Sequence, residues 1–209
     1  MQEIDAIFSL IILLLSVIIH EVSHGYVALI LGDPTAKLDG RLTLNPLKHL
    51  DPVGSIFLPL LLFLSGSSFL IGWAKPVMIN PYNLKKPRRD EALVALAGPV
   101  SNIVLALFFS LLIRLGPTLS LPPSAVYILS MVVLINLVLA CFNLVPIPPL
   151  DGSKILFAIL PVRFGAVRAT LERFGFIFVI FFAFFLWGFF APFIFKVYSC
   201  LVVVGCLPH

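Results

Sequence analysis

The sequence predicts an all-α polytopic membrane protein, and three observations lead to this fold class. Hydrophobic residues make up 60% of the 209 residues, and charged residues only 11%. The mean hydropathy is +1.12, higher than a soluble chain shows, because a soluble chain needs polar side chains to cover its surface. Several apolar runs also reach the length of about 20 residues that a helix needs to cross a bilayer.

Four of these runs qualify as spanning helices, at about residues 6–31, 92–115, 124–145 and 174–195. The residues before the first run include Glu3 and Asp5 but no basic side chain, unlike the start of a cleaved signal peptide. We therefore expect the first run to be retained. No internal repeat or long polar linker separates the runs, which predicts a single membrane-embedded domain over residues 1–209.

A further apolar run at about 53–73 is interrupted by Gly54, Pro59 and a Ser65–Ser68 cluster, which weakens it as a plain spanning helix. Basic residues flank it on both sides: Lys37, Arg41 and Lys48 before it, and Lys75, Lys85, Lys86, Arg88 and Arg89 after it. The positive-inside rule places both flanks in the cytoplasm, so we expect the run to re-enter the membrane from that side. A fifth span is the alternative, because the run is long enough.

The charge pattern also predicts orientation and partners. It places the N-terminus and the uncharged loop 116–123 outside, and the basic loop from Lys154 to Arg173 inside. The net charge of +4 comes from short segments between apolar runs and not from one continuous face. We therefore interpret the cations as membrane-flanking residues in a multi-pass protein of the cell membrane. The expected partner is the lipid bilayer, and nucleic acid is not expected to bind.

The first run contains His20-Glu21-Val22-Ser23-His24, an HExxH sequence. Residues four apart share one face of a helix, so both imidazoles can reach one metal ion, while Glu21 can serve as the general base for a metal-bound water. Each ionisable group inside a membrane helix costs about 2.5 to 3.5 kcal/mol, and metal binding offsets that cost. The alternatives are a hydrogen-bond cluster between packed helices and a helix end in the cytoplasm.

Asp151 is the candidate for a third metal ligand. It follows the third apolar run in the sequence Asn143-Leu-Val-Pro-Ile-Pro-Pro-Leu-Asp-Gly152, where the prolines stop the helix. Irregular backbone at membrane depth is tolerated where it lines a polar cavity. Without further evidence, a structural role for Asp151 is as plausible as a ligand role: the residue can belong to an ordinary turn or be the N-cap of a helix over about 153–160.

Two motifs resemble those of the site-2 proteases, intramembrane zinc metalloproteases of the M50 type. That family pairs HExxH with a later Asn-x-x-Pro-x-x-x-Leu-Asp-Gly sequence, here His20–His24 and Asn143–Gly152, and Gly98–Asn102 matches its intervening Gly-x-x-x-Asn. Residues 45–49 and 72–76 resemble the short prokaryotic branch, which lacks PDZ and CBS modules. The resemblance covers about residues 6–160, with a C-terminal helix at about 174–195 beyond it.

The resemblance implies one zinc ion per chain, held by His20, His24 and Asp151. It implies that Glu21 activates the zinc-bound water and later passes the proton to the leaving amine, and that Asn143 stabilises the oxyanion. An interhelical hydrogen bond is the alternative role of Asn143. The implied activity is hydrolysis of peptide bonds in or near transmembrane segments of substrate proteins, at a site toward the cytoplasm.

The second hypothesis is a zinc-binding membrane protein without protease activity, such as a transporter or sensor. Glu21 distinguishes it from a protease, because a transporter does not need a carboxylate next to the first ligand. A scaffold that binds transmembrane segments is the third. Two further residues are kept out of the predicted site. We interpret His49 as a solvated interfacial histidine, with a role in supporting or gating the site as the alternative. We interpret Asn102 either as a contact to the substrate or the catalytic water or as part of helix packing.

Overall fold

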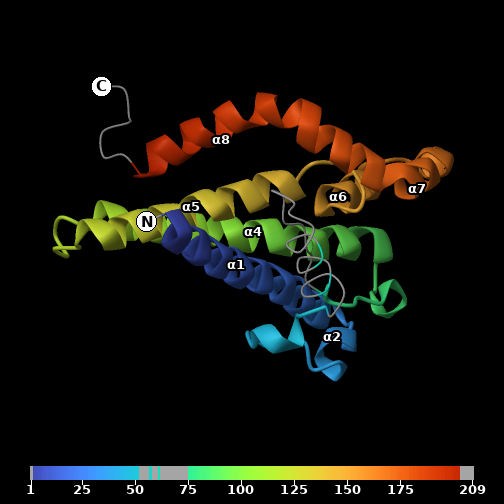
Figure 1. Ribbon diagram of the computed structural model, residues 1–209. Coiled ribbons are helices and arrows are strands. Elements are labelled where there is room, and N and C mark those ends of the chain that lie inside the picture. The colour runs from blue at the N-terminus through green and yellow to red at the C-terminus, as the bar shows by residue number, and fades with distance from the viewer. Residues whose placement is uncertain (1, 52–56, 58–60, 62–74, 203–209) are drawn as a thin grey trace.

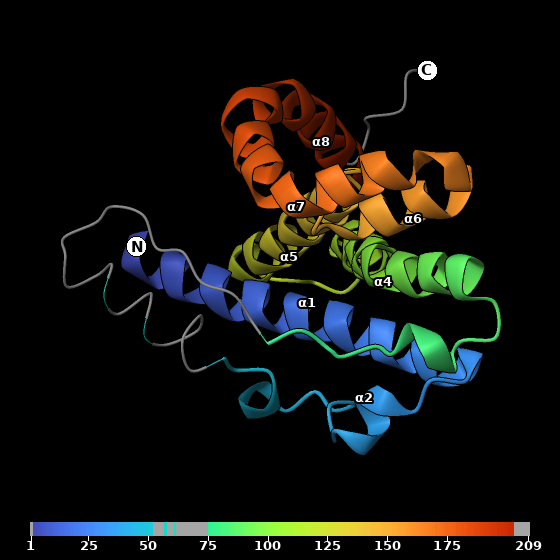
Figure 2. The same ribbon diagram turned by 90° about the vertical axis from the view of Figure 1, so that its right-hand side faces the viewer.

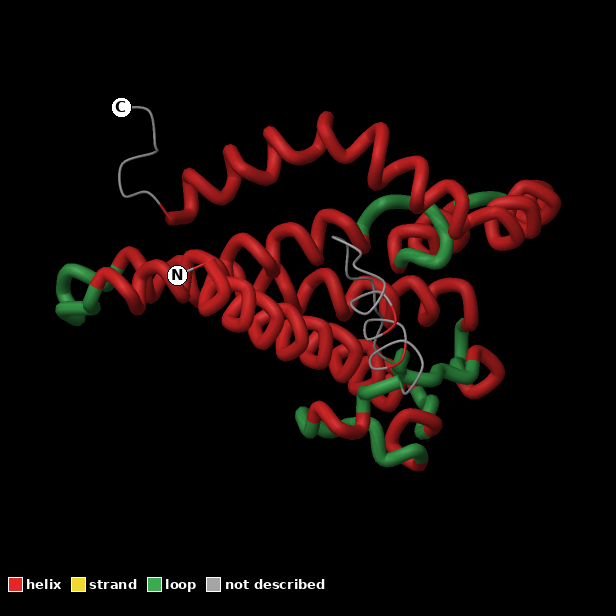
Figure 3. Tube along the Cα trace, in the orientation of Figure 1, coloured by secondary structure: helices red, strands yellow, loops and turns green. Residues whose placement is uncertain are grey.

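The computed structural model describes residues 2–51, 57, 61 and 75–202. Within this part of the chain every regular element is helical, and no strand is drawn in it (Figure 3). Four helical segments of the described chain are long and apolar enough to cross a membrane: Ile7–Leu31, Pro87–Arg114, Pro123–Asn143 and Gly165–Val202. They confirm the all-α polytopic membrane fold. The run at 53–73, apart from residues 57 and 61, lies outside the described residues.

Three helices form the bundle that carries the site. They are α1 (Gln2–Leu31), α4 (Pro87–Arg114) and α5 (Pro123–Asn143), which lie side by side in both ribbon views (Figures 1 and 2). The buried stripe of α4 contains four small residues and one asparagine at intervals of three or four, and small residues let neighbouring backbones approach closely. These residues are Ala95, Gly98, Asn102, Ala106 and Ser110.

The third span ends where the sequence predicts. Helix α5 stops at Asn143, the proline-containing loop 144–150 follows, and the short helix α6 runs over Asp151–Ile159. Leu150 occupies the N-cap position of α6, so the N-cap role considered for Asp151 is wrong. Asp151 instead lies in the first turn, where the helix dipole favours a negative charge.

The fourth span is longer than the predicted 174–195. It consists of α7 (Gly165–Phe181), a single π-helical turn η5 (Phe182–Leu186) and α8 (Trp187–Val202). The segment arches over the bundle in Figure 1, as expected where a π turn bends a helix. Ile194 of α8 joins Val133 and Leu137 of α5 in one apolar core.

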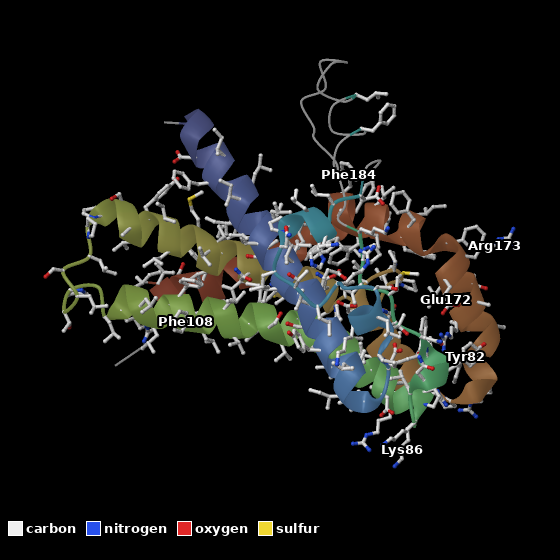
Figure 4. The ribbon with its side chains drawn as sticks, turned by 90° about the horizontal axis from the view of Figure 1, so that it is seen from below. Tyr82, Lys86, Phe108, Glu172, Arg173 and Phe184 are labelled. Carbon is white, nitrogen blue, oxygen red and sulfur yellow. The ribbon has the colours of Figure 1, made fainter. Side chains whose placement is uncertain are left out.

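The two ends of the molecule differ. In Figure 1 the N-terminus, the α4–α5 connection and the end of α8 lie toward the left, whereas α2 (Thr35–Leu38), the start of α4, α6 and α7 lie toward the right. Figure 4 shows Tyr82, Lys86, Glu172 and Arg173 at the right-hand end, away from Phe108. The basic segments that the sequence places on one side of the membrane therefore do share one end of the fold.

The segment 75–80 is irregular backbone that lies along α1 (Figure 2). Its backbone N–H groups are held at three points: Lys75 N donates to His49 O at 2.8 Å, Val77 N to the Glu21 carboxylate at 2.9 Å, and Asn80 N to the Asp33 carboxylate at 2.6 Å. Short 3-10 turns, η1 (Pro46–Lys48) and η3 (Pro81–Asn83), lie before and after it in the chain, and η4 (Val162–Phe164) precedes α7.

Candidate metal centre

His20, His24 and Asp151 converge at one point between α1 and the start of α6. The Nε2 atoms of the two histidines lie 3.1 Å and 3.2 Å from the same oxygen, Asp151 Oδ2. All three side chains are buried. The helix of α1 places the two imidazoles one turn apart, with their ring planes 87° apart and their centroids at 4.6 Å.

The separations fit a metal ion of the size of zinc. Zinc bound to imidazole nitrogen or carboxylate oxygen at about 2.0 to 2.2 Å in a tetrahedral site places its ligand atoms about 3.3 Å apart. The two nitrogen–oxygen distances in the structure, 3.1 Å and 3.2 Å, are close to this value. The three residues form a group that can hold a metal ion, and the donor set of two imidazoles and one carboxylate is typical of catalytic zinc.

The second ring nitrogen of each histidine contacts an acceptor on α4. His20 Nδ1 lies 2.6 Å from Asn102 Oδ1, and His24 Nδ1 lies 2.6 Å from the carbonyl oxygen of Val94. Such contacts keep the proton on Nδ1 and leave the Nε2 lone pair for a metal. The α4 helix therefore orients both ligands without contributing one.

Gly98 leaves room for the two histidines. A Cβ atom at this position would lie 2.5 Å from both His20 Nε2 and His24 Nε2, a distance that real Cβ atoms do not adopt. Because Gly98 has no side chain, α4 can pack directly against the Nε2 atoms of the two histidines.

Asp151 has the ionisation state that a ligand needs. Its carboxyl group is ionised at neutral pH, because the ordinary pKa of an aspartate side chain is about 3.9. Lys154 Nζ lies 3.9 Å from the other carboxylate oxygen, Oδ1.

Glu21 is held beside this centre by backbone. Its Oε2 accepts a hydrogen bond from Val77 N at 2.9 Å, so the carboxylate is fixed against the segment 75–80. This hydrogen bond uses Oε2, and among the described residues no hydrogen bond to Oε1 is found, so Oε1 can take a proton.

Comparisons with known proteins agree with this geometry. A model of peptidase family M50 matches residues 120–186, which include Asn143 and Asp151. YwhC of Bacillus subtilis, assigned by its name to the zinc metalloproteases, is 42% identical over 176 residues, covering 81% of this chain and 77% of YwhC. The chain belongs to peptidase family M50.

Other M50 relatives are longer than this chain. Rip2 of Mycolicibacterium smegmatis, also assigned by its name to the zinc metalloproteases, is 34% identical over 169 residues, which are 80% of this chain but 62% of Rip2. Zinc metalloprotease MJ0392 of Methanocaldococcus jannaschii is 29% identical over 167 residues, 77% of this chain and 36% of that protein. No solved structure matches the chain significantly.

The side-chain amide N–H group of Asn143 is hydrogen-bonded within its own helix. Its Nδ2 donates to the carbonyl oxygen of Leu139 at 3.0 Å, one turn earlier on the same helix. That hydrogen bond is not the interhelical one considered from the sequence. The oxyanion role of Asn143 stays a prediction, and it requires the amide to leave Leu139.

His49 differs from its predicted environment. The sequence suggested a solvated interfacial residue, but His49 is only 1% exposed, so that interpretation is wrong. Its Nε2 donates to the carbonyl oxygen of Thr43 at 2.8 Å, and its own carbonyl accepts from Lys75. It is buried because it joins the segments before and after the run 52–74.

Two buried polar residues near His20 were not in the predicted site. Asn136 on α5 and Ser16 on α1 are both buried and belong to the hydrogen bonds that reach Asn102. The signal that points to Asn136 is an amide in the middle of an apolar span, where an unpaired polar group is costly.

A cavity of about 500 Å³ is lined by chain neighbours and contacts of the candidate metal-binding residues, and not by His20, His24 or Asp151 themselves. Val94, whose carbonyl contacts His24, lines it together with Pro148, Pro149, Ser153 and Lys154, and residues of α7 close its other side. This volume lies within the range of about 300 to 1,000 Å³ that ligand pockets occupy.

Proposed function

We propose that this chain is a zinc-dependent intramembrane endopeptidase that hydrolyses peptide bonds in or near transmembrane segments of other proteins. One observation carries the proposal. A buried group of two histidines and one aspartate, with a backbone-held glutamate next to the first histidine, lies at the junction of membrane helices. The names of the relatives, which place them among the zinc metalloproteases, support zinc as the metal.

The residues divide the chemistry as follows. His20, His24 and Asp151 hold the zinc ion, which supplies a Lewis acid for the scissile carbonyl and for the attacking water. Glu21 takes a proton from that water as its oxygen forms a bond to the carbonyl carbon. When the C–N bond breaks, Glu21 returns the proton to the leaving amine. Asn143 serves as the oxyanion donor once its amide turns from Leu139.

The cavity beside the ligands is where the substrate lies in this proposal. Its Pro148 and Pro149 have no backbone N–H and so cannot continue a helix, which leaves irregular backbone of the loop 144–150 beside the cavity. A transmembrane substrate has to unwind locally before its carbonyl can approach the centre, since a helix buries that carbonyl in its own hydrogen bonds.

The proposal includes the location of the site and the extent of the domain. The centre lies in the half of the molecule that carries the basic segments, which supports a site toward the cytoplasm of a multi-pass protein. The fourth span packs on α5 through one apolar core, which supports a single membrane-embedded domain.

Replacing Glu21 by Gln tests the proposal against a zinc-binding protein without protease activity. The purified chain is reconstituted with zinc and a synthetic single-span peptide whose apolar helix is interrupted by an Asn-Gly pair. Loss of a general base lowers the cleavage rate by about 10² to 10⁴-fold, while zinc content stays at one ion per chain because Glu21 is not a ligand. Peptide products are measured by mass spectrometry.

The matched control is Asp39→Asn, which neutralises an exposed carboxylate in the same half of the molecule and leaves cleavage unchanged. Equal product from the wild type and Glu21→Gln, with zinc bound to both, would show that the chain is not a protease of this type.

A further inference from the structure

A row of buried side chains connects a backbone carbonyl on α5 to the first metal ligand on α1. Asn136 Nδ2 lies 2.9 Å from the carbonyl oxygen of Val132, Asn136 Oδ1 lies 2.8 Å from Asn102 Nδ2, and Asn102 Oδ1 lies 2.6 Å from His20 Nδ1. Asn102 and Asn136 are completely buried. The row crosses the three helices of the bundle.

The direction of every hydrogen bond in this row follows from its first member. A backbone carbonyl can only accept, so the atom of Asn136 that faces Val132 must be the NH₂ group. That orientation turns Asn136 Oδ1 toward Asn102, which must therefore present its own NH₂ group. Asn102 Oδ1 is then left facing His20, where it can only accept.

Two further contacts hold the same orientation. Asn136 Nδ2 also lies 2.9 Å from Ser16 Oγ, and Asn102 Nδ2 lies 3.5 Å from the carbonyl oxygen of Ser16. The second contact is long, but a carbonyl again tolerates only a donor. Neither amide can turn over without placing an oxygen against another oxygen in a dry interior, where such an arrangement is costly.

We infer that Asn136 and Asn102 are positioning residues that set the tautomer of His20 and thereby the affinity of the metal site. With Asn102 Oδ1 as acceptor, His20 carries its proton on Nδ1 and leaves the Nε2 lone pair for a metal ion bound between His20 and Asp151. A reversed Asn102 amide would donate to Nδ1 and favour the proton on Nε2, which removes the lone pair that a metal needs. The inference rests on the metal site of the proposed function.

The test measures zinc affinity, by competition with a chromophoric chelator, in the purified zinc-free protein. Asn136→Leu removes the group that orients Asn102 but touches no ligand, and the expected loss of affinity is about tenfold or more, the range found for such supporting residues. Ser110→Ala is the control, because this buried hydroxyl on α4 donates to the carbonyl oxygen of Leu107 in its own helix and, among the described residues, is not part of the row. Its zinc affinity stays within about twofold of the wild type.

The double variant separates this role from ordinary packing. If Asn136 acts through Asn102, adding Asn136→Leu to Asn102→Leu weakens zinc binding no further, although it lowers the melting temperature of the zinc-free protein. Affinity losses that multiply in the double variant, or an Asn136→Leu affinity within twofold of the wild type, would overturn the inference.

A conservative pair keeps the test usable if Asn136→Leu does not fold. Asn102→Asp retains an oxygen opposite His20 Nδ1, and in its neutral carboxylic-acid form its O–H group still donates to Asn136 Oδ1, so it binds zinc at least about tenfold more tightly than Asn102→Leu. Equal affinities for these two variants would also refute the inference. A wild type that fails to bind zinc would instead refute the metal site itself.

Discussion

At the scale of single residues, α1 places both histidines of HExxH on one face, and contacts with α4 orient their rings. The four-residue spacing of His20 and His24 gives the shared face, whereas the contacts with Asn102 and Val94 fix the two rings. A second carboxylate, Asp33, fixes the backbone that holds Glu21. Its Oδ2 accepts from Asn80 N, three residues after Val77.

Asp33 makes the stability of this arrangement depend on pH. Burial alone would raise the pKa of Asp33, but hydrogen bonds from Asn83, Thr35 and Asn80 outweigh it and hold the pKa below its ordinary value of 3.8. Because the folded pKa is the lower one, the stabilisation is present above pH 3.8 and is lost as the pH falls through the folded pKa.

We therefore expect Asp33→Asn to lower the melting temperature of the zinc-free protein at pH 7. The free energy of unfolding falls by about 1 to 3 kcal/mol when a buried charged hydrogen-bond network is broken. Each kcal/mol lowers the melting temperature by about 2 to 4 °C for a chain of this size. The difference from the wild type narrows below pH 3.8. Thermal unfolding in detergent at several pH values measures this difference in melting temperature, and Asp39→Asn, at an exposed position, is the control. A difference that widens in acid would contradict the stabilising role of the ionised Asp33.

At the scale of elements, α7 packs closely against the loop that leads to Asp151. A Cβ atom at Gly175 would lie 2.2 Å from the carbonyl oxygen and 2.8 Å from the carbonyl carbon of Pro148. Both are backbone atoms and cannot turn aside as a flexible side chain can. Because Pro148 and Asp151 are three residues apart, the packing of α7 limits where the third ligand can lie.

Gly175→Ala is expected to displace the loop 144–150 and with it Asp151. Overpacking of this kind costs about 1 to 3 kcal/mol, so both the melting temperature and the zinc affinity should fall. Gly165→Ala is the matched control at the start of the same helix, because a Cβ there meets no atom of the described residues within 4 Å. Zinc affinity in Gly175→Ala equal to that in Gly165→Ala would show that the contact with Pro148 does not position the ligand.

At the scale of the whole molecule, the helices put the metal ligands and the basic segments in the same half of the fold. The exposed Lys86 lies at that end, whereas the exposed Thr118 lies in the connection between α4 and α5 at the other. Arg114, at the end of α4, is an exception to the charge pattern, and it donates to the carbonyls of Cys200 and Leu201 near the end of α8.

The positive-inside rule predicts that the Lys86 end faces the cytoplasm. In a chain whose natural cysteines are replaced, a membrane-impermeant maleimide added to intact cells should label Thr118→Cys at once and Lys86→Cys only after the cells are lysed. Mass-shift gels give the labelled fraction. The reverse pattern would place the metal centre on the outer side.

The sequence by itself determined the membrane class, the four spans and the residues of HExxH. These features depend on local quantities, namely the length of apolar runs and the helical period, which a chain carries without its neighbours. The prolines after Asn143 likewise predicted where α5 ends, because a missing N–H acts within one turn.

Only the tertiary structure decided which atoms from distant segments meet. It brought Asp151 against His20 and His24, buried His49, turned Asn143 toward its own helix, and connected Asn136 through Asn102 to a metal ligand. An amide or histidine in a sequence gives its donors and acceptors but not their partners. The partners depend on how α1, α4 and α5 pack, and that packing is set by small residues such as Gly98 acting across helices.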